Sequence, residues 1–208
     1  MAHKPPTAAA GGPPASGASL PMHQARAERA DAAANRERIL SAARCLFAER
    51  GAAGVSMDAV AEAAGVGKGT VFRRFGDRAG LTGELMDAEM RAFQDELLRG
   101  PPPLGPGAPA AERLEAFACA LPAFLDRNLE LALAAGPPAA GTAAPFASLV
   151  LHARVLLDEL RPGEDHEVLA EMIVSALGAA VVRQVRRERG FDLTQLQSAA
   201  RTLLHGVI

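Results

Sequence analysis

Residues 57–78 read MDAVAEAAGVGKGTVFRRFGDR, two short helical patterns joined by a glycine-rich turn. Ser56 stands where it can cap a helix over residues 57–64, because its side chain can accept a hydrogen bond from a free backbone N–H. Gly65 ends this helix, since glycine readily adopts the left-handed conformation that follows many helices. A second short helix is expected over residues 68–75. Two short helices with such a turn form a helix-turn-helix pattern.

A surface that combines glycines with a lysine and a threonine is typical of phosphate binding, and the phosphate belongs either to a nucleotide or to a nucleic acid. A nucleotide-binding P-loop requires Gly-x-x-x-x-Gly-Lys followed by Ser or Thr, between a strand and a helix. Here Gly69 follows Lys68, and Glu62 occupies the place of the first glycine. A helix, not a strand, precedes the turn. The pattern therefore favours DNA over a nucleotide.

The second helix carries residues with the chemistry for DNA contact. Lys68, Gly69 and Thr70 lie at its N-terminal end, where free N–H groups, the helix dipole and a missing Cβ allow close approach. Arg73 and Arg74 are adjacent cations that reach phosphate oxygens or guanine O6 and N7. The alternative for these two arginines is an ordinary solvated helix face.

The composition of the 208-residue chain predicts an all-α protein. Hydrophobic residues make up 49% of it, and there is no tryptophan or tyrosine. Alanine, which favours helix, supplies much of that apolar fraction, and runs of β-branched residues are almost absent. The periodicity and the breaks predict about nine helices, including a first one capped by Asn35, two over 110–127 and 128–135, and a long one over 164–189.

The chain is expected to have three parts, separated by composition. Residues 1–30 are rich in Ala, Gly and Pro and are expected to form a disordered tail. Residues 31–80 form the helix-turn-helix DNA-binding domain, with three helices, and residues 81–208 form a second helical domain. The apolar run Met172–Val182 is too short for a membrane helix, which needs about 20 residues. A cytoplasmic protein is expected.

Charge is distributed unevenly along the chain. Residues 35–80 hold eight basic and five acidic side chains, a balance of +3, which leaves −5 for the rest of a chain with formal net charge −2. A basic block on an acidic body fits an anionic partner held at one end. Cys45 and Cys119 are far apart and are interpreted as buried free thiols, since a disulfide framework needs more cysteines in a shorter chain.

Five motifs occur in order and at consistent spacing between residues 39 and 81. They are ILxAAxxLF at 39–47, glycine at 51, VSMxxVA at 55–61, AGVGKGTVFRRF at 64–75 and DRxxL at 77–81. With these motifs, residues 35–98 resemble the DNA-binding domain of TetR-type transcriptional regulators. The remainder of the chain resembles the family only in the number and length of its helices.

The resemblance implies roles for further residues. Ser56 takes the place of a hydroxyl that caps the second helix and touches phosphate. Phe72 stands where the family often has a tyrosine whose hydroxyl donates to phosphate, so this contact is lost or replaced by packing. Arg78 replaces a frequent lysine as a phosphate clamp, and Gly67 replaces a common serine that caps the third helix.

The resemblance also implies that residues 81–208 form a ligand-binding and dimerisation domain. The candidate ligand pocket consists of Phe117, Leu121, Phe124, Phe146, Leu149, His152 and Leu156, and the alternative is that these residues form a filled core. The candidate dimer interface consists of Leu169, Ile173, Leu177, Val181, Leu196, Leu203 and Leu204, whose spacing suits a four-helix interface.

The function expected from the resemblance is that of a homodimeric repressor, released from a palindromic operator in double-stranded DNA by a small-molecule effector. No catalytic constellation is visible, so no enzyme, cofactor or metal site is expected; residues 164–167 are interpreted as the cap of a helix. Two alternatives remain open. One is a DNA-binding protein with a solid body and no effector. The other is an all-helical small-molecule-binding protein or enzyme with a vestigial DNA module.

Overall fold

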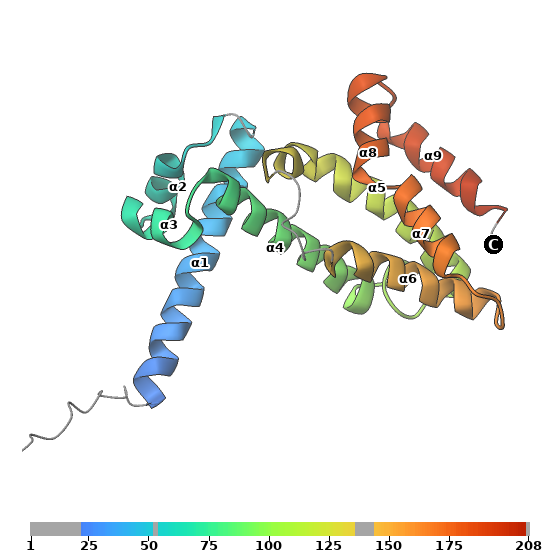
Figure 1. Cartoon of the computed structure of the whole chain (residues 1–208), viewed down its shortest axis with the longest axis horizontal. Coiled ribbons are helices and arrows are strands. Elements are labelled where there is room, and N and C mark those ends of the chain that lie inside the picture. The colour runs from blue at the N-terminus through green and yellow to red at the C-terminus, as the bar shows by residue number, and fades with distance from the viewer. Residues whose placement is uncertain (1–21, 52–53, 136–143, 207–208) are drawn as a thin grey trace, which may run out of the picture. The chain divides into compact units, whose positions relative to one another are not determined.

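The computed structural model describes residues 22–51, 54–135 and 144–206, and of residues 22–29, 135, 144 and 145 it describes the backbone alone. Its described residues form helices and no strands, so the all-α prediction is confirmed. The elements are α1 (Met22–Arg50), α2 (Met57–Ala64), α3 (Lys68–Phe75), α4 (Arg78–Arg99), α5 (Ala110–Ala135), α6 (Ala144–Leu160), α7 (Glu167–Ala176), α8 (Ala179–Val182), a π-helix (Arg183–Glu188) and α9 (Leu193–Leu204) (Figure 1).

The chain divides into two compact units, residues 1–37 and 38–208. The described part of the first unit is the start of α1, which begins at Met22. The expected cap at Asn35 is therefore wrong, and so is a disordered tail reaching to residue 30. Alanine, arginine and glutamate dominate this stretch, and their helix propensity extends the helix N-terminally. The rest of the expected tail lies outside the described residues.

A first hydrophobic cluster holds α2 and α3 against the C-terminal part of α1 and the start of α4. We call residues 38–85 the head. Their buried side chains, together with one from α5, are Ile39, Leu40, Ala43, Leu46, Val55, Met57, Val60, Ala61, Val71, Phe75, Leu81, Leu85 and Leu131. Burying these apolar side chains is the main favourable term that fixes the short helices, which would be marginal in isolation.

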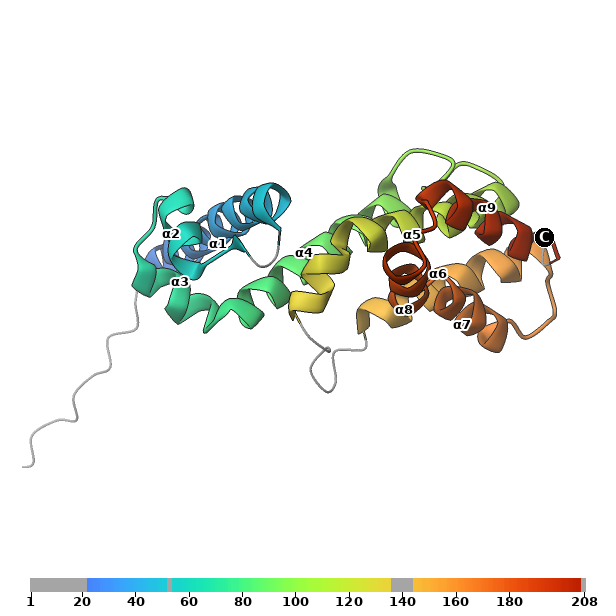
Figure 2. The ribbon, with the colours of Figure 1, turned by 90° about the horizontal axis from the view of Figure 1, so that it is seen from above.

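A second cluster fills the body, residues 86–206, to which α4, α5, α6, α7 and α9 contribute. Helix α4 continues from the head into this region, where α5 packs on α4, α6 and α9 (Figures 1 and 2). Phe93 of α4 and Phe124 of α5 stack with ring centroids 4.7 Å apart at the centre of the cluster. A single long helix thus belongs to both clusters and links head and body covalently.

Two predicted helix boundaries in the body are wrong. Helix α5 runs unbroken from Ala110 to Ala135, although Pro122 lies inside it. A proline removes one helical hydrogen bond, but the packing of its buried neighbours on both sides keeps the helix continuous. The predicted helix over 164–189 is interrupted after α7, at Leu177 and Gly178, before α8 and the π-helix follow.

The segment Glu167–Glu188 is long and apolar enough to cross a membrane by length and composition. In the fold it is not one straight helix, because the break at Gly178 divides it. Five of its residues are buried: Ala170, Val174, Leu177, Gly178 and Val182. Part of its apolar surface is therefore packed within the body.

Three polar positions differ from expectation or extend it. Cys45 is exposed and Cys119 is partly buried, so the expectation of two buried thiols is wrong for Cys45. His166 is the N-cap residue of α7 and is buried; its Nδ1 lies 2.9 Å from Asp158 Oδ1 on α6. This contact ties the start of α7 to the end of α6.

Candidate nucleic-acid interface

The turn between α2 and α3 fixes the angle at which α3 leaves the head. Ser56 Oγ accepts a hydrogen bond from the N–H of Ala59 at 3.1 Å, which caps α2 as predicted. Gly65 adopts φ 64° and ψ 36°, the left-handed region in which side chains with a Cβ are strained. The Val66 N–H then donates to the carbonyl of Ala61 at 3.0 Å. The turn is therefore satisfied by its own backbone, and α3 starts immediately after it.

Helix α3 has one buried face and one exposed face. Val71 and Phe75 point into the head cluster. The exposed residues of the helix are Lys68, Gly69, Phe72, Arg73 and Arg74, and Thr70 is half-buried. A Cβ added at Gly69 would meet nothing within 4 Å, so the first turn is open on this side. The structure thus brings the residues predicted for DNA contact on α3 to one solvent-facing surface.

Arg73 and Arg74 are both exposed and make no ion pair or hydrogen bond with any described residue. Unpaired guanidinium groups carry five N–H donors that match phosphate and guanine geometry. Phe72, beside them, is 47% exposed, which is unusual for a large apolar side chain that belongs only to a core. This arrangement favours contact for Phe72 over core packing.

Lys68 is held differently from the two arginines. Its Nζ lies 2.5 Å from Asp58 Oδ2 on α2, and both side chains are more than half exposed. An exposed ion pair of this kind contributes about 0–1 kcal/mol to stability, so it breaks easily when a stronger anion approaches. Lys68 can therefore bind a phosphate only when its ion pair with Asp58 is broken.

The start of α4 lies directly beside the end of α3. Asp77 caps α4, since its Oδ1 accepts from the Gly80 N–H at 2.8 Å. A Cβ on Gly80 would clash with the Phe75 carbonyl oxygen, so only glycine allows this close approach. Arg78 is half-buried here, and its Nε is shielded from solvent without a partner among the described residues. Arg78, Ser56 and the exposed face of α3 are the candidate interface.

The residues predicted to line a ligand pocket lie mostly within the body cluster. Phe117, Leu121, Phe124, Leu149 and Leu156 are buried there and pack on one another. Phe146, by contrast, is 40% exposed near the start of α6, away from that cluster's interior. The five buried residues belong to one continuous set, which fits a core and a ligand site in that core equally.

His152 is a polar residue that contacts this set. Its ring centroid lies 5.3 Å from that of Phe117, and its Nε2 is buried without a hydrogen-bond partner among the described residues. Burial, followed by the nearby charge of Arg113, lowers the pKa of His152 to about 4. The imidazole is therefore neutral at pH 7.

The predicted dimer-interface residues divide into two groups. Leu177, Val181, Leu196 and Leu203 line an apolar groove of about 340 Å³ between the α7–α8 segment and α9. Leu169, Ile173 and Leu204 pack instead against the body cluster. The groove also includes Val185 and Phe191, which sequence reasoning missed because the π-helix and the short connection after it carry no regular periodicity.

Comparisons with known proteins agree with this geometry. Residues 39–85 match the sequence profile of the bacterial regulatory proteins of the tetR family. An HTH-type transcriptional regulator of Staphylococcus aureus (strain USA300) is 37% identical over 65 residues, which cover 31% of this chain and 35% of that protein. The match thus spans about a third of the length of the curated relatives.

Solved structures extend the likeness to the body. A TetR-family transcriptional regulator from Pectobacterium atrosepticum is 25% identical, with a TM-score of 0.61 over 86% of this chain and 97% of that one. FadR from Bacillus subtilis, solved with stearoyl-CoA, is 20% identical, with a TM-score of 0.57 over 83% of this chain and 98% of that one; it shares the fold. The head is therefore a DNA-binding domain of the tetR family, and the chain as a whole shares the fold of a TetR-family transcriptional regulator.

Proposed function

We propose that this protein is a sequence-specific transcriptional repressor that binds double-stranded DNA through the exposed face of α3. The observation that carries the proposal is the presence of two unpartnered arginines, Arg73 and Arg74, on the second helix of a helix-turn-helix. In this motif the second helix enters the major groove. Either arginine then has the donors for guanine O6 and N7, or for the flanking phosphates.

The remaining residues of the interface position the helix on the duplex. Lys68, Gly69 and Thr70 present the N-terminal end of α3, where backbone N–H groups and the helix dipole favour phosphate. Ser56 and Arg78 flank this end from α2 and α4 and are assigned to phosphate as well. Phe72 offers an apolar contact, for example with a thymine methyl group, in place of a hydroxyl.

The protein is proposed to act as a homodimer whose interface lies at the groove between α7–α8 and α9. The groove is apolar and includes the exposed side chain of Leu203. The same surface of a second copy can bury these apolar side chains across a two-fold axis. Two-fold symmetry would make the operator roughly palindromic, with half-sites one helical turn or more apart. Leu169, Ile173 and Leu204 would support this surface from within.

A small-molecule effector is proposed to bind in the body and to release the DNA. The candidate pocket is the set Phe117, Leu121, Phe124, Phe146, Leu149, His152 and Leu156. A neutral imidazole with an unpartnered Nε2 in an apolar surrounding supports a ligand there, since it offers one polar handle. Binding would favour the conformation in which the two α3 helices are wrongly spaced, and α4 would carry the change from body to head. This assignment makes the protein a regulator of the cytoplasm and not an enzyme.

Fluorescence anisotropy with DNA from upstream of the gene tests the DNA-binding assignment. Replacing Arg73 and Arg74 together by alanine is expected to weaken binding about 10- to 1,000-fold and, where phosphates are contacted, to reduce the salt slope by about 1 per contact. The matched control replaces Arg91 and Arg99, exposed on the second half of α4, and leaves binding unchanged. Equal affinity and salt slope in the Arg73/Arg74 variant would show that α3 does not read DNA.

The effector is tested separately from DNA binding. A thermal-shift screen of small metabolites, followed by anisotropy with each stabilising compound, is expected to find one that lowers DNA affinity. If none stabilises the protein, the alternative of a solid body without effector is favoured. If the protein shifts no DNA but binds a metabolite tightly, the alternative of a small-molecule-binding protein or enzyme is favoured.

A further inference from the structure

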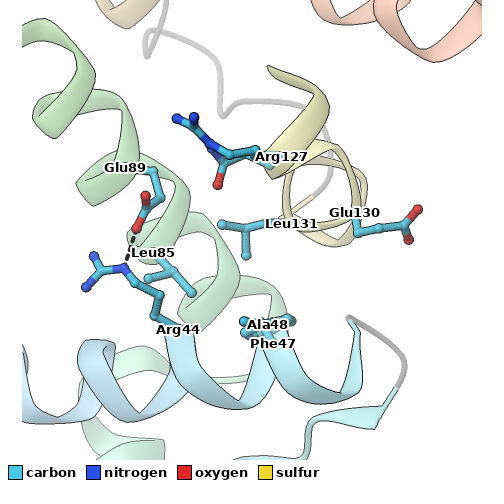
Figure 3. Close-up of a pocket in the computed structure, with 9 residues that line it drawn as sticks. Arg44, Phe47, Ala48, Leu85, Glu89, Arg127, Glu130 and Leu131 are labelled. Atoms are coloured by element: carbon cyan, nitrogen blue, oxygen red, sulfur yellow. Dashed lines mark hydrogen bonds and ion pairs between the residues drawn. The ribbon is translucent and has the colours of Figure 1, made fainter. Parts of the chain in front are cut away.

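A small cavity lies where α1, α4 and α5 meet, at the junction of head and body. Its volume is about 150 Å³. The floor is apolar and is formed by Phe47, Leu85 and Leu131, and the rim is polar (Figure 3). None of the residues proposed above for DNA, effector or dimer contact lines it. A void of this size has held a benzene molecule in another protein, so it accommodates about six heavy atoms.

Leu131 gives this cavity its position between the two regions. It comes from the last turns of α5 in the body, but its buried side chain belongs to the cluster of the head. Figure 3 shows Leu131 reaching from α5 toward α4 and α1, with Leu85 on the facing side. A molecule seated on this floor would contact three helices at once, two from the head and one from the body.

The rim offers hydrogen-bond donors that nothing else in the described structure uses. Arg44 donates through Nε to Glu89 Oε1 at 2.5 Å, which leaves its two terminal nitrogens outside that bond. Arg127 makes no ion pair or hydrogen bond with a described residue. Two guanidinium groups with unused N–H donors on an apolar floor match a planar anionic head with a short apolar tail.

Both acids that line the cavity have a basic partner. Glu89 is engaged by Arg44. Glu130 points away from Leu131 in Figure 3, and its Oε1 lies 3.8 Å from Arg187 Nη2. Asn128 adds a neutral amide whose Nδ2 donates to the Phe124 carbonyl at 2.9 Å. Two cations and two acids thus line the cavity, and Arg187, which lies outside the lining, partly offsets Glu130.

We propose that this junction cavity binds a short-chain carboxylate, with the carboxylate at Arg127 and Arg44 and the alkyl chain on Phe47, Leu85 and Leu131. The size selects a chain of about six carbons. The site is separate from the effector pocket in the body. Because it joins head and body, an occupant would stabilise one spacing of α1, α4 and α5; this consequence for DNA rests on the proposed function.

Sodium hexanoate is the probe for binding, followed by NMR of leucine methyl groups. Hexanoate is expected to shift the methyl signals of Leu85 and Leu131 and to leave Leu204, deep in the body, unchanged. Hexan-1-ol tests the need for the charge and acetate tests the need for the tail, and both are expected to bind at least tenfold more weakly. Absence of shifts with 10 mM hexanoate, or shifts only at body leucines such as Leu121 and Leu156, would overturn the proposal.

Two variants test the two halves of the site. Arg127→Gln removes the unpaired charge, and Ala48→Leu places a larger side chain at the cavity wall. Each is expected to raise the dissociation constant for hexanoate at least tenfold, whereas Arg91→Gln, elsewhere on α4, leaves it unchanged. Circular dichroism melting confirms that the variants are folded. Unchanged hexanoate binding in folded Arg127→Gln and Ala48→Leu would also overturn the proposal.

The regulatory consequence is measured with the same protein and DNA. In anisotropy, hexanoate is expected to change DNA affinity about fivefold or more in the wild type and to have no effect on the Ala48→Leu variant. If hexanoate binds at Leu131 but no DNA is bound, the cavity site stands and the repressor function fails. If DNA is bound and hexanoate is not, the repressor function stands and the cavity site fails.

Discussion

Lys68 at the start of α3 is paired with Asp58 in the first turn of α2, with 2.5 Å between Nζ and Oδ2. The Asp58 carboxylate therefore pairs with the lysine that the proposed interface needs for phosphate. It also places a negative charge close to the surface proposed to bind DNA. The pair is exposed, so its own contribution to stability is small. Its main effect is expected on DNA affinity.

Asp58→Asn is predicted to tighten DNA binding. The change frees Lys68 and removes one acid that repels phosphate, so affinity at low salt is expected to rise about 3- to 10-fold and the gain to shrink as salt screens it. Stability is expected to fall by about 0.3–1 kcal/mol, because Asp58 also interacts favourably with the N-terminal dipole of α2. Anisotropy titrations at several salt concentrations measure the first effect and thermal melts the second. Unaltered affinity at low salt would mean that Lys68 does not contact phosphate.

Gly80 and Gly83, one turn apart on α4, are predicted to respond oppositely to alanine. At Gly80 a Cβ would clash with the Phe75 carbonyl, so Gly80→Ala forces α4 away from α3 and destabilises the protein by about 1–3 kcal/mol. At Gly83 a Cβ would meet nothing within 4 Å, so Gly83→Ala is expected to stabilise the helix by about 0.5–1 kcal/mol. Urea denaturation of both variants checks the sign. Similar effects at both positions would contradict the close packing of α4 on α3.

Gly69→Ala is predicted to weaken DNA binding without destabilising the fold. The first turn of α3 has open space at this position, so alanine is expected to leave the fold intact and to raise stability by up to about 1 kcal/mol. The added methyl group lies on the exposed face proposed to approach the DNA backbone closely. Affinity is therefore expected to fall about tenfold, the cost of roughly one lost contact. A stable variant with wild-type affinity would place Gly69 outside the interface.

The head could be predicted from sequence in detail because its signals are local. Gly65 and Ser56 are a turn residue and a cap, and each acts within one helix turn of its own position. The spacing of Val71 and Phe75 places both on the inner face of α3, which leaves the arginines between them outside. Those inferences need no knowledge of the tertiary fold.

The body could be predicted less well, because its decisive features depend on contacts between distant segments. The apolar pattern continues through the break at Gly178, so periodicity alone indicates one helix where there are shorter ones. Pro122 is tolerated because packing overrides a local preference. The junction cavity depends on Leu131 of α5, whose side chain packs in the head cluster and not in the body cluster. No spacing in the sequence predicts this packing.

Leu203→Arg is predicted to disrupt the proposed dimer. Leu203 lies on α9 at the groove and is 62% exposed, as is Leu98 on α4, which does not line the groove. A charge within an apolar interface is left without a partner when it is buried, so association is expected to weaken at least 100-fold. Leu98→Arg has the same change in charge and exposure and should leave the oligomeric state unaltered. Analytical ultracentrifugation distinguishes the two, and a Leu203→Arg variant that sediments as the wild type does would place the interface elsewhere.

His152 is predicted to make the stability of the body depend on pH. Burial lowers its pKa to about 4, from an ordinary value of 6.5, so between these values the unfolded chain binds a proton that the folded protein does not. The free energy of unfolding therefore decreases as the pH falls from about 6.5 towards 4, and this contribution is constant above and below that window. After allowance for the ring's partial contact with solvent, the decrease from pH 7.5 to pH 4.5 is expected to be roughly 1–2 kcal/mol.

His152→Phe keeps the ring beside Phe117 but cannot be protonated, so the difference between its unfolding free energy and that of the wild type should grow by this amount as the pH falls. Urea denaturation of both proteins at pH 7.5, 6 and 4.5 measures that difference, and a constant difference would mean that His152 takes up a proton equally in the folded and unfolded states.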